Sequence, residues 1–123
     1  MEMAEGRCLC GAVRIKAVGA PLGVGICHCM DCRNHHGALF HASAIFPSEQ
    51  VEVAGDTRHF LGRYFCGTCG SSVYSQSGDE MELHLGMFDA PDSFVPGYEL
   101  WTVRREQWLP EFSGLKRFAR DRE

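Results

Sequence analysis

The chain has 123 residues, a length typical of one domain, so we expect a single domain over residues 1–123. Its 12 basic and 16 acidic residues give a formal net charge of −4, which argues against a nucleic-acid-binding protein because such proteins need a basic surface. No apolar run reaches the roughly 18 residues that a membrane-spanning helix needs, so no membrane partner is expected. Residues 1–5 carry acids and no hydrophobic stretch, which predicts no signal peptide and a cytoplasmic protein.

Short segments with β patterns, separated by glycine and proline turns, predict a mostly β fold. In the first of them, residues 12–18, Val13, Ile15 and Ala17 alternate with basic residues, as in a half-buried strand. Further strands are expected at residues 23–26, 39–46, 51–53, 57–61, 63–65, 72–76, 81–87 and 98–103.

Turn residues and periodicity add detail to this pattern. A Gly55-Asp56 turn predicts that strands 51–53 and 57–61 form a hairpin. Alternation of apolar residues over 81–87 predicts one continuous strand. Short helical turns are expected at residues 30–36, ended by Gly37, and at residues 106–112. The charged tail, residues 115–123, is expected to end frayed.

Seven cysteines indicate metal binding, because the count is odd and no signal peptide points to a disulfide framework. Cys66-x-x-Cys69, flanked by glycines, is a strong chelating pair, and Cys8-x-Cys10 is a second, tighter pair. Together they predict a closed tetrathiolate site for a structural zinc ion. The alternative is that either pair forms a disulfide or consists of inert buried thiols.

Cys27, Cys29 and Cys32 remain, three thiols on one short loop. Catalytic zinc sites typically have three protein ligands and one exchangeable position, so this set predicts a second, open zinc site suited to a thiol substrate. The alternative is a structural site that a histidine closes. His35 or His36 is a more plausible fourth ligand than His28 or His41. The His28 ring should point away from the metal if Cys27 and Cys29 both point inward. His59 and His84 are expected to be ordinary surface histidines.

The cysteine motifs, in their order and spacing, resemble the glutathione-dependent formaldehyde-activating enzyme family, which also includes the centromere protein V type proteins. The resemblance spans residues 6–112 and is carried by GRCLCGAVR at 6–14, CHCMDCR at 27–33 followed by Gly37, FCGTCGS at 65–71, LGMFD at 85–89 and a late Trp108. It implies a β-tent fold of small antiparallel sheets around two zinc ions. It also implies that Cys8, Cys10, Cys66 and Cys69 hold the structural ion and that Cys27, Cys29 and Cys32 hold the catalytic one.

The resemblance further implies a carbon–sulfur lyase that joins formaldehyde and glutathione into S-hydroxymethylglutathione. We therefore expect a zinc-dependent lyase acting on a small-molecule thiol adduct, with glutathione as one candidate. Residues 98–102 replace a histidine-led segment common in the family, so the natural thiol and electrophile stay open, as does the oligomeric state.

Candidate substrate-binding residues are cations, because glutathione carries two carboxylates. Arg33, next to the open site in sequence, is the expected binding residue, whereas Arg58, Arg63, Arg104 and Arg105 are expected to be solvated surface charges. Proton transfer has three candidates, His28, His35 and Asp31. Two rival functions are a non-catalytic zinc-binding scaffold or interaction module and a thiol redox protein.

Overall fold

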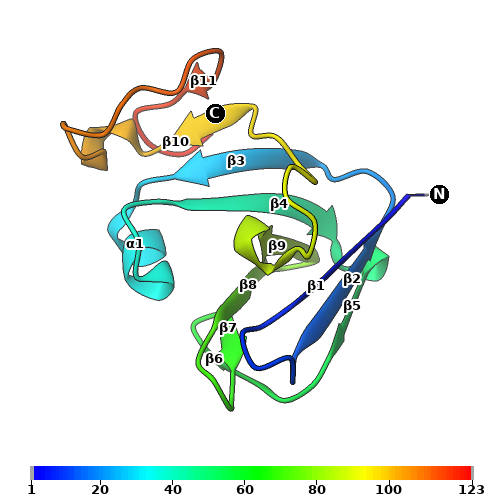
Figure 1. Cartoon of the computed structure of the whole chain (residues 1–123). Coiled ribbons are helices and arrows are strands. Elements are labelled where there is room, and N and C mark those ends of the chain that lie inside the picture. The colour runs from blue at the N-terminus through cyan, green and yellow to red at the C-terminus, as the bar shows by residue number, and fades with distance from the viewer. Residues whose placement is uncertain (1, 123) are drawn as a thin grey trace.

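The protein is mostly β, as predicted, and the structure, a computed structural model, describes residues 2–122. Its strands form two sheets (Figure 1). The smaller sheet is antiparallel, in the order β1 (Met3–Arg7), β2 (Arg14–Val18) and β5 (Val51–Ala54). The larger sheet has eight strands, in the order β11 (Lys116–Arg117), β10 (Tyr98–Leu100), β3 (Gly23–Cys27), β4 (His41–Pro47), β9 (Glu80–His84), β8 (Ser72–Ser77), β7 (Arg63–Cys66) and β6 (Thr57–Phe60).

The larger sheet is mixed rather than purely antiparallel. β10 runs parallel to both β3 and β11, while the other neighbours are antiparallel. The C-terminal strands therefore lie along the outer edge of β3, as Figure 1 shows. No helix within residues 2–122 has the length and apolar character needed to cross a membrane.

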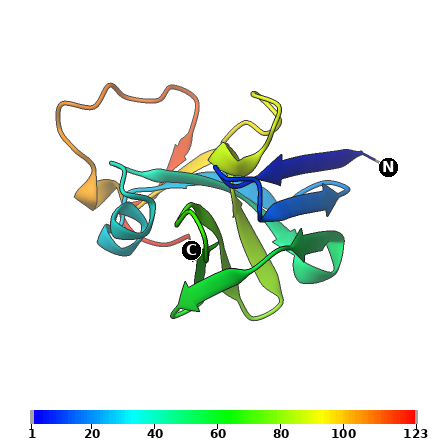
Figure 2. The same cartoon turned by 60° about the horizontal axis from the view of Figure 1, so that its bottom comes forward.

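The hydrophobic core takes side chains from both sheets. Ile15 of β2 is 3% exposed, and Phe46 of β4, Val73 of β8 and Leu83 of β9 are fully buried. The strands alternate as the sequence predicts, so that each sheet turns its apolar face to the other. In Figure 2 the small sheet lies at one end of the molecule, and a short helix lies at the other.

That helix, α1 (Met30–His36), spans the predicted residues. Cys29 is its N-cap, and the Cys29 thiol accepts a hydrogen bond from the Cys32 amide at 3.3 Å. Gly37 ends the helix in the left-handed conformation at φ 65°, where a residue without a side chain is favoured. The helix thus begins inside the central cysteine motif and fixes the backbone between Cys29 and Cys32.

Two predictions in the middle of the chain are wrong. The segments at 51–54 and 57–60 do not form a hairpin, because β5 pairs with β2 and β6 pairs with β7, so the turn between them connects the two sheets. The strand expected over 81–87 ends at His84, and Leu85–Met87 forms a 3₁₀ turn. The chain bends there because Phe88 pairs with Gly6 of β1, which draws it away from the larger sheet.

The C-terminal region also differs from the prediction. Residues 106–112 form no helix, since Arg105 instead donates hydrogen bonds to the carbonyls of Leu109 and Pro110. The strand expected over 98–103 ends at Leu100, and a 3₁₀ turn follows at Thr102–Arg104. A further 3₁₀ turn, outside this region, lies at Ser48–Gln50. The C-terminal tail forms β11, which pairs with β10. At the other end of the chain, β1 is a strand that was not predicted from the sequence. The expected fraying at Glu123 lies outside the described residues.

Candidate metal centres and a thiol-lined cavity

Four cysteines from two distant segments form one cluster, here called the tetrathiol cluster. Cys8 and Cys10 lie in the loop between β1 and β2, and Cys66 and Cys69 lie at the turn between β7 and β8. Their four sulfurs all lie within 4.8 Å of one another, with Sγ–Sγ distances of 3.6 Å for Cys8–Cys10 and 3.8 Å for Cys10–Cys66. A tetrahedral zinc ion with Zn–S bonds of about 2.3 Å places its sulfurs about 3.8 Å apart, so the spacing fits such an ion.

Backbone amides around this cluster point at the sulfurs. The amide of Val13 donates to Cys8 Sγ at 3.2 Å, and the amides of Thr68 and Cys69 donate to Cys66 Sγ at 3.3 and 3.4 Å. Hydrogen bonds of this kind stabilise thiolates, the form that binds a metal. Cys8 and Cys66 are buried, and Cys10 is exposed. The donor set therefore fits a structural metal ion.

The thiols of this cluster differ in how readily each one ionises. Hydrogen bonds from Ser71 lower the pKa of the Cys69 thiol to about 5. The Ala12 amide would lower the pKa of Cys10, but partial loss of solvent around its sulfur and hydrogen bonds with the neighbouring thiols raise it to about 11. Four adjacent sulfurs cannot all carry a negative charge without a compensating ion, and a divalent cation would supply that charge.

Cys27, Cys29 and Cys32 form a second group, the trithiol cluster, at the end of β3 and the first turn of α1. The sulfurs of Cys27 and Cys32 lie within 4.8 Å of each other and of a ring nitrogen of His41, whereas the predicted third ligand, Cys29, is not part of this close group. The interaction with Cys32 lowers the pKa of Cys27 to about 7, whereas burial raises the pKa of Cys29 and the interaction with Cys27 raises that of Cys32. The three thiols therefore oppose one another's ionisation, and a soft divalent cation would supply the compensating positive charge.

His41 is the histidine beside the trithiol cluster, rather than His35 or His36. It is the cross-strand partner of Cys27 in the β3–β4 pair, so the two side chains lie on one face of the sheet. His41 is 5% exposed, and its Nδ1 lies 2.8 Å from Nε2 of His36. Burial lowers the pKa of His41 to about 4, so the ring is neutral at pH 7.

A cavity of about 330 Å³ opens onto the trithiol cluster and is lined by all three of its cysteines and by His41. Its opposite walls come from β8, β9, β10 and the C-terminal tail. The ionisable side chains on these walls are mostly acidic: Glu80, Glu82 and Asp121, with Arg122 as the basic one. Burial raises the pKa of Glu82. A small molecule in this cavity would meet the trithiol cluster and a negatively charged wall together.

Arg33 does not line the thiol cavity. Its guanidinium lies 2.6 Å from the carboxylate of Glu106, and the residue lines a different hollow beside the end of α1. Arg63 lies 3.5 Å from Asp31, and Arg58 and Arg104 are exposed, as expected for surface charges.

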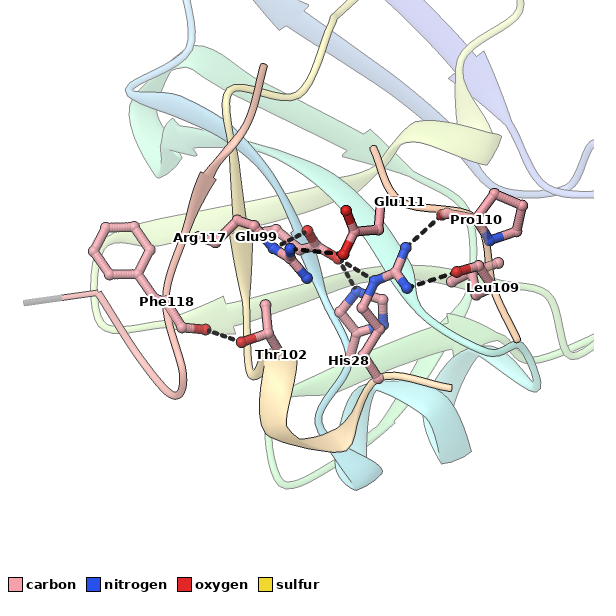
Figure 3. A network of polar contacts seen from close by, with 9 residues as sticks. His28, Glu99, Thr102, Leu109, Pro110, Glu111, Arg117 and Phe118 are labelled. Atoms are coloured by element: carbon pink, nitrogen blue, oxygen red, sulfur yellow. Dashed lines mark hydrogen bonds and ion pairs between the residues drawn. The ribbon is translucent and has the colours of Figure 1, made fainter. Parts of the chain in front are cut away.

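His28 and Arg105 both contact Glu99, the centre of a buried polar network. Figure 3 shows His28 and Arg117 around Glu99. The Glu99 carboxylate is fully buried and accepts hydrogen bonds from His28 Nε2 at 2.6 Å and Arg105 Nε at 2.9 Å, and Arg117 lies 3.4 Å away. Burial alone would raise the pKa of Glu99, but its bonds to His28 and Arg105 lower it. Arg105 is therefore not a solvated surface charge as predicted, and the His28 ring is held toward Glu99.

The remaining histidines also depart in part from expectation. His59 is exposed, as predicted, and stacks on Tyr64 with ring centroids 4.8 Å apart. His84, in contrast, is 3% exposed, so its prediction as a surface histidine is wrong. It ends β9 and faces His35 and His36 of α1, whose ring nitrogens lie within 4.8 Å of its own.

Sequence reasoning missed the far wall of the cavity. Glu80 and Glu82 lie on β9, and Asp121 and Arg122 lie in a tail that was expected to fray. The tail is held by backbone bonds to β10 and the following turn, including Trp101 N to Arg120 O at 3.1 Å, and the Trp101 ring nitrogen donates to Asp121 at 2.8 Å. Only the apolar Leu115 and Phe118 gave a sequence signal that this segment docks.

Comparisons with known proteins agree with the fold and show the family. Residues 3–104 match the model of the family described as glutathione-dependent formaldehyde-activating enzyme. A Schizosaccharomyces pombe protein, named an uncharacterized lyase, is 33% identical over 75 residues, which are 57% of this chain and 55% of that protein. The chain thus matches about half the length of this curated relative. A crystal structure of a Rhodobacter sphaeroides protein has a similar fold, with a TM-score of 0.55 and 24% identity over 75% of this chain and 97% of its own.

Proposed function

The chain belongs to the glutathione-dependent formaldehyde-activating enzyme family, and from this premise we propose that it is a zinc-dependent carbon–sulfur lyase. Its proposed substrate is the adduct of formaldehyde with a small thiol, and the thiol of the family, glutathione, is one candidate. The family match and the lyase-named relative support a lyase-type activity. The zinc dependence and the specific reaction are parts of the proposal.

The observation that carries the proposal is the cavity of about 330 Å³, into which all three thiols of the trithiol cluster open. Ligand cavities are commonly of this size or larger, and they hold a few convergent polar groups. The tetrathiol cluster has four donors within 4.8 Å of one another, whereas beside the cavity the donors this close to one another are Cys27, Cys32 and His41, with Cys29 on the cavity wall. In the proposal, Cys8, Cys10, Cys66 and Cys69 hold a structural zinc ion, and Cys27, Cys29 and Cys32 hold the catalytic one.

When bound there, zinc would lower the pKa of a substrate thiol and favour its thiolate form. In the forward reaction, the sulfur forms a bond to the formaldehyde carbon, the carbonyl π electrons move to oxygen, and that oxygen receives the proton that the thiol has lost. Cleavage is the reverse. His41 is proposed to donate a hydrogen bond from Nε2–H to the oxygen on which charge develops, because its Nδ1 is bonded to His36 and its ring lies beside Cys27 and Cys32; the thiol proton reaches that oxygen through solvent.

The experiment compares Cys29→Ser with Cys66→Ser. Serine retains the N-cap acceptor of α1, so Cys29→Ser removes one metal ligand while the helix keeps its cap. We expect Cys29→Ser to lower kcat/KM by more than about tenfold, or about 1.4 kcal/mol, with a nearly unchanged melting temperature. Cys66→Ser should prevent stable folding, because structural zinc sites contribute folding free energy directly.

The readout is the exchange rate between formaldehyde and its S-hydroxymethyl adduct, measured by NMR with ¹³C-formaldehyde at equilibrium. Thermal denaturation of both variants provides the stability comparison. Equal destabilisation by the two substitutions, or full exchange activity in Cys29→Ser, would contradict the assignment of the trithiol cluster as the catalytic site.

A second candidate function is a non-catalytic zinc module, and the position of His41 favours it. A ring nitrogen of His41 lies within 4.8 Å of the sulfurs of Cys27 and Cys32, close enough for a small rotation to make it a metal ligand. A site closed in this way would be structural and would have no place for a substrate thiol. On this alternative, the protein would retain its metal and would show no exchange activity.

A further inference from the structure

Four histidines gather in one place between α1, β4 and β9: His35, His36, His41 and His84. Ring nitrogens of His35, His36 and His84 all lie within 4.8 Å of one another. The His84 ring lies 3.9 Å from that of His36 and 5.1 Å from that of His35, measured between centroids. Their separation along the chain shows that the fold, not local sequence alone, creates this group.

His84 has a polar atom that the described structure leaves without a partner. The residue is 3% exposed, and its Nδ1 lies 2.9 Å from the hydroxyl oxygen of Ser72. Its Nε2 is one of three buried side-chain nitrogen or oxygen atoms without a hydrogen bond within residues 2–122. Leaving a buried nitrogen unpaired costs about 1–3 kcal/mol, so a ligand at Nε2 would recover a substantial free energy.

The surrounding contacts orient the three rings as metal ligands are usually oriented. Ser72 Oγ lies between His84 Nδ1 and His35 Nε2, at 2.9 and 3.0 Å, and can accept a hydrogen bond from each. His36 Nε2 can donate to His41 Nδ1 at 2.8 Å. Each ring therefore uses one nitrogen in a hydrogen bond and retains the other for a ligand. Such bonds to the second nitrogen fix the tautomer of metal-binding histidines.

We propose that His35, His36 and His84 form a third metal site, a trihistidine site separate from both cysteine clusters. The donors define the class of ion. Imidazole nitrogens suit borderline divalent ions such as Zn²⁺, Ni²⁺ and Cu²⁺, whereas Mg²⁺ and Ca²⁺ prefer oxygen ligands. Burial disfavours the charged form of each ring, which keeps a lone pair available for an ion.

The site also has an entry path. A cavity of about 570 Å³ is lined by His36, His41, Ser72 and His84, and it lies on the side of the sheet where the tetrathiol residue Cys8 is found. The thiol cavity is lined by His41 but not by the three proposed ligands. An ion could therefore reach the trihistidine site, and exchange a fourth ligand there, without passing the trithiol cluster.

The test titrates zinc-loaded protein with Ni²⁺ by calorimetry and measures the metal content per chain before and after. His84→Ala and His35→Ala each remove one proposed ligand, and His59→Ala removes an exposed histidine as the matched control. We expect wild type and His59→Ala to bind one more ion per chain than either ligand variant, or to bind it at least tenfold more tightly. Near-ultraviolet absorption monitors thiolate-to-nickel charge transfer and so reports any displacement of zinc from the cysteine clusters.

Three outcomes would overturn the proposal. The first is that wild type binds no ion beyond those at the cysteines, and the second is that His84→Ala and His35→Ala bind the additional ion as tightly as wild type. The third outcome is that thiolate-to-nickel absorption accounts for all bound Ni²⁺. If His84→Ala does not fold, His35→Ala decides, because its half-buried side chain lies on the helix and its loss opens no cavity in the core. Neither result depends on lyase activity, so this proposal and the proposed function can fail separately.

Discussion

Glu99 shows how a single buried charge can organise the C-terminal third of this protein. The carboxylate is fully buried and is contacted by His28 from the central motif, by Arg105 and by Arg117 from the tail. Removing one member of a buried charge network leaves the others uncompensated in a region of low dielectric constant. Glu99 therefore links the segment that carries Cys27 and Cys29 to the chain that covers it.

We predict that Glu99→Gln lowers the free energy of unfolding by about 3–5 kcal/mol, because Arg105 and Arg117 lose their buried counter-charge. Glu111→Gln is the matched control, since Glu111 also pairs with Arg117, at 3.3 Å, but is 76% exposed. Its loss should cost less than about 1 kcal/mol. Guanidinium denaturation of the metal-loaded variants measures both values. Similar costs for the two substitutions would show that the Glu99 network does not stabilise the fold.

At the scale of the elements, the contact between β1 and the turn at Leu85–Met87 explains where β9 ends. Gly6 of β1 forms an isolated bridge with Phe88, and its backbone lies directly against the carbonyl of Met87. A side chain at position 6 would overlap that carbonyl oxygen. The close approach joins the small sheet to the end of β9, next to His84.

Gly6→Ala should therefore destabilise the protein by about 1–3 kcal/mol, as overpacking in a well-packed interior does. Gly86→Ala provides the comparison, because a Cβ at position 86 meets no atom within 4 Å and the residue lies in the same contact region. Its effect should stay below about 1 kcal/mol. Thermal unfolding of the two variants tests this, and an unchanged melting temperature for Gly6→Ala would show that β1 and the turn can separate at little cost.

The sequence predicted those elements whose signals are local. Cysteine spacing, glycine positions and alternation identified α1 with its Gly37 cap, the strands on either side of the Cys66–Cys69 turn, and the proximity of Cys8 and Cys10 to Cys66 and Cys69. It did not predict pairing between distant segments. The turn at Gly55-Asp56 has a hairpin signal, yet the strands beside it join different sheets, because β5 pairs with β2 and β6 pairs with β7.

The same limit applies to the candidate site. Six consecutive residues are enough to predict the trithiol loop. His41, Glu82 and Asp121, in contrast, line the cavity because the strand order β10-β3-β4-β9 of the larger sheet brings them together. His84 looked like a polar residue on a solvated strand face, and the helix that buries it is 48 residues away in sequence, counted from His36. No local pattern encodes that contact.

At the scale of the whole molecule, the two cysteine clusters occupy different structural positions. The tetrathiol cluster joins a loop of the small sheet to a turn of the large one, and so links the two layers of the core. The trithiol cluster lies where β3 meets α1, facing a cavity with three acids and one arginine on its other walls. This arrangement opposes the binding of anionic substrates, as does the net charge of −4.

We therefore predict that thiol charge governs substrate preference. Among thiols of similar size, kcat/KM for formaldehyde exchange should fall from thiocholine through 2-mercaptoethanol to 3-mercaptopropionate, by roughly tenfold per unit of charge or about 1.4 kcal/mol. Glu82→Gln should reduce this preference, and added salt should weaken it. The exchange rates measured by NMR provide the test. Equal rates for the three thiols would mean that the acidic wall does not contact the substrate.

The central claim is that the trithiol cluster holds a metal with an exchangeable fourth position, and ¹¹³Cd NMR of the cadmium-substituted protein tests it most directly. The tetrathiol and trithiol clusters should give two separate resonances, because their donor sets differ. On addition of a substrate thiol, we expect one resonance to move toward the position of a four-sulfur site while the other stays in place. If neither ¹¹³Cd chemical shift changes when the thiol is added, His41 or another protein group closes the site, and the lyase proposal is wrong.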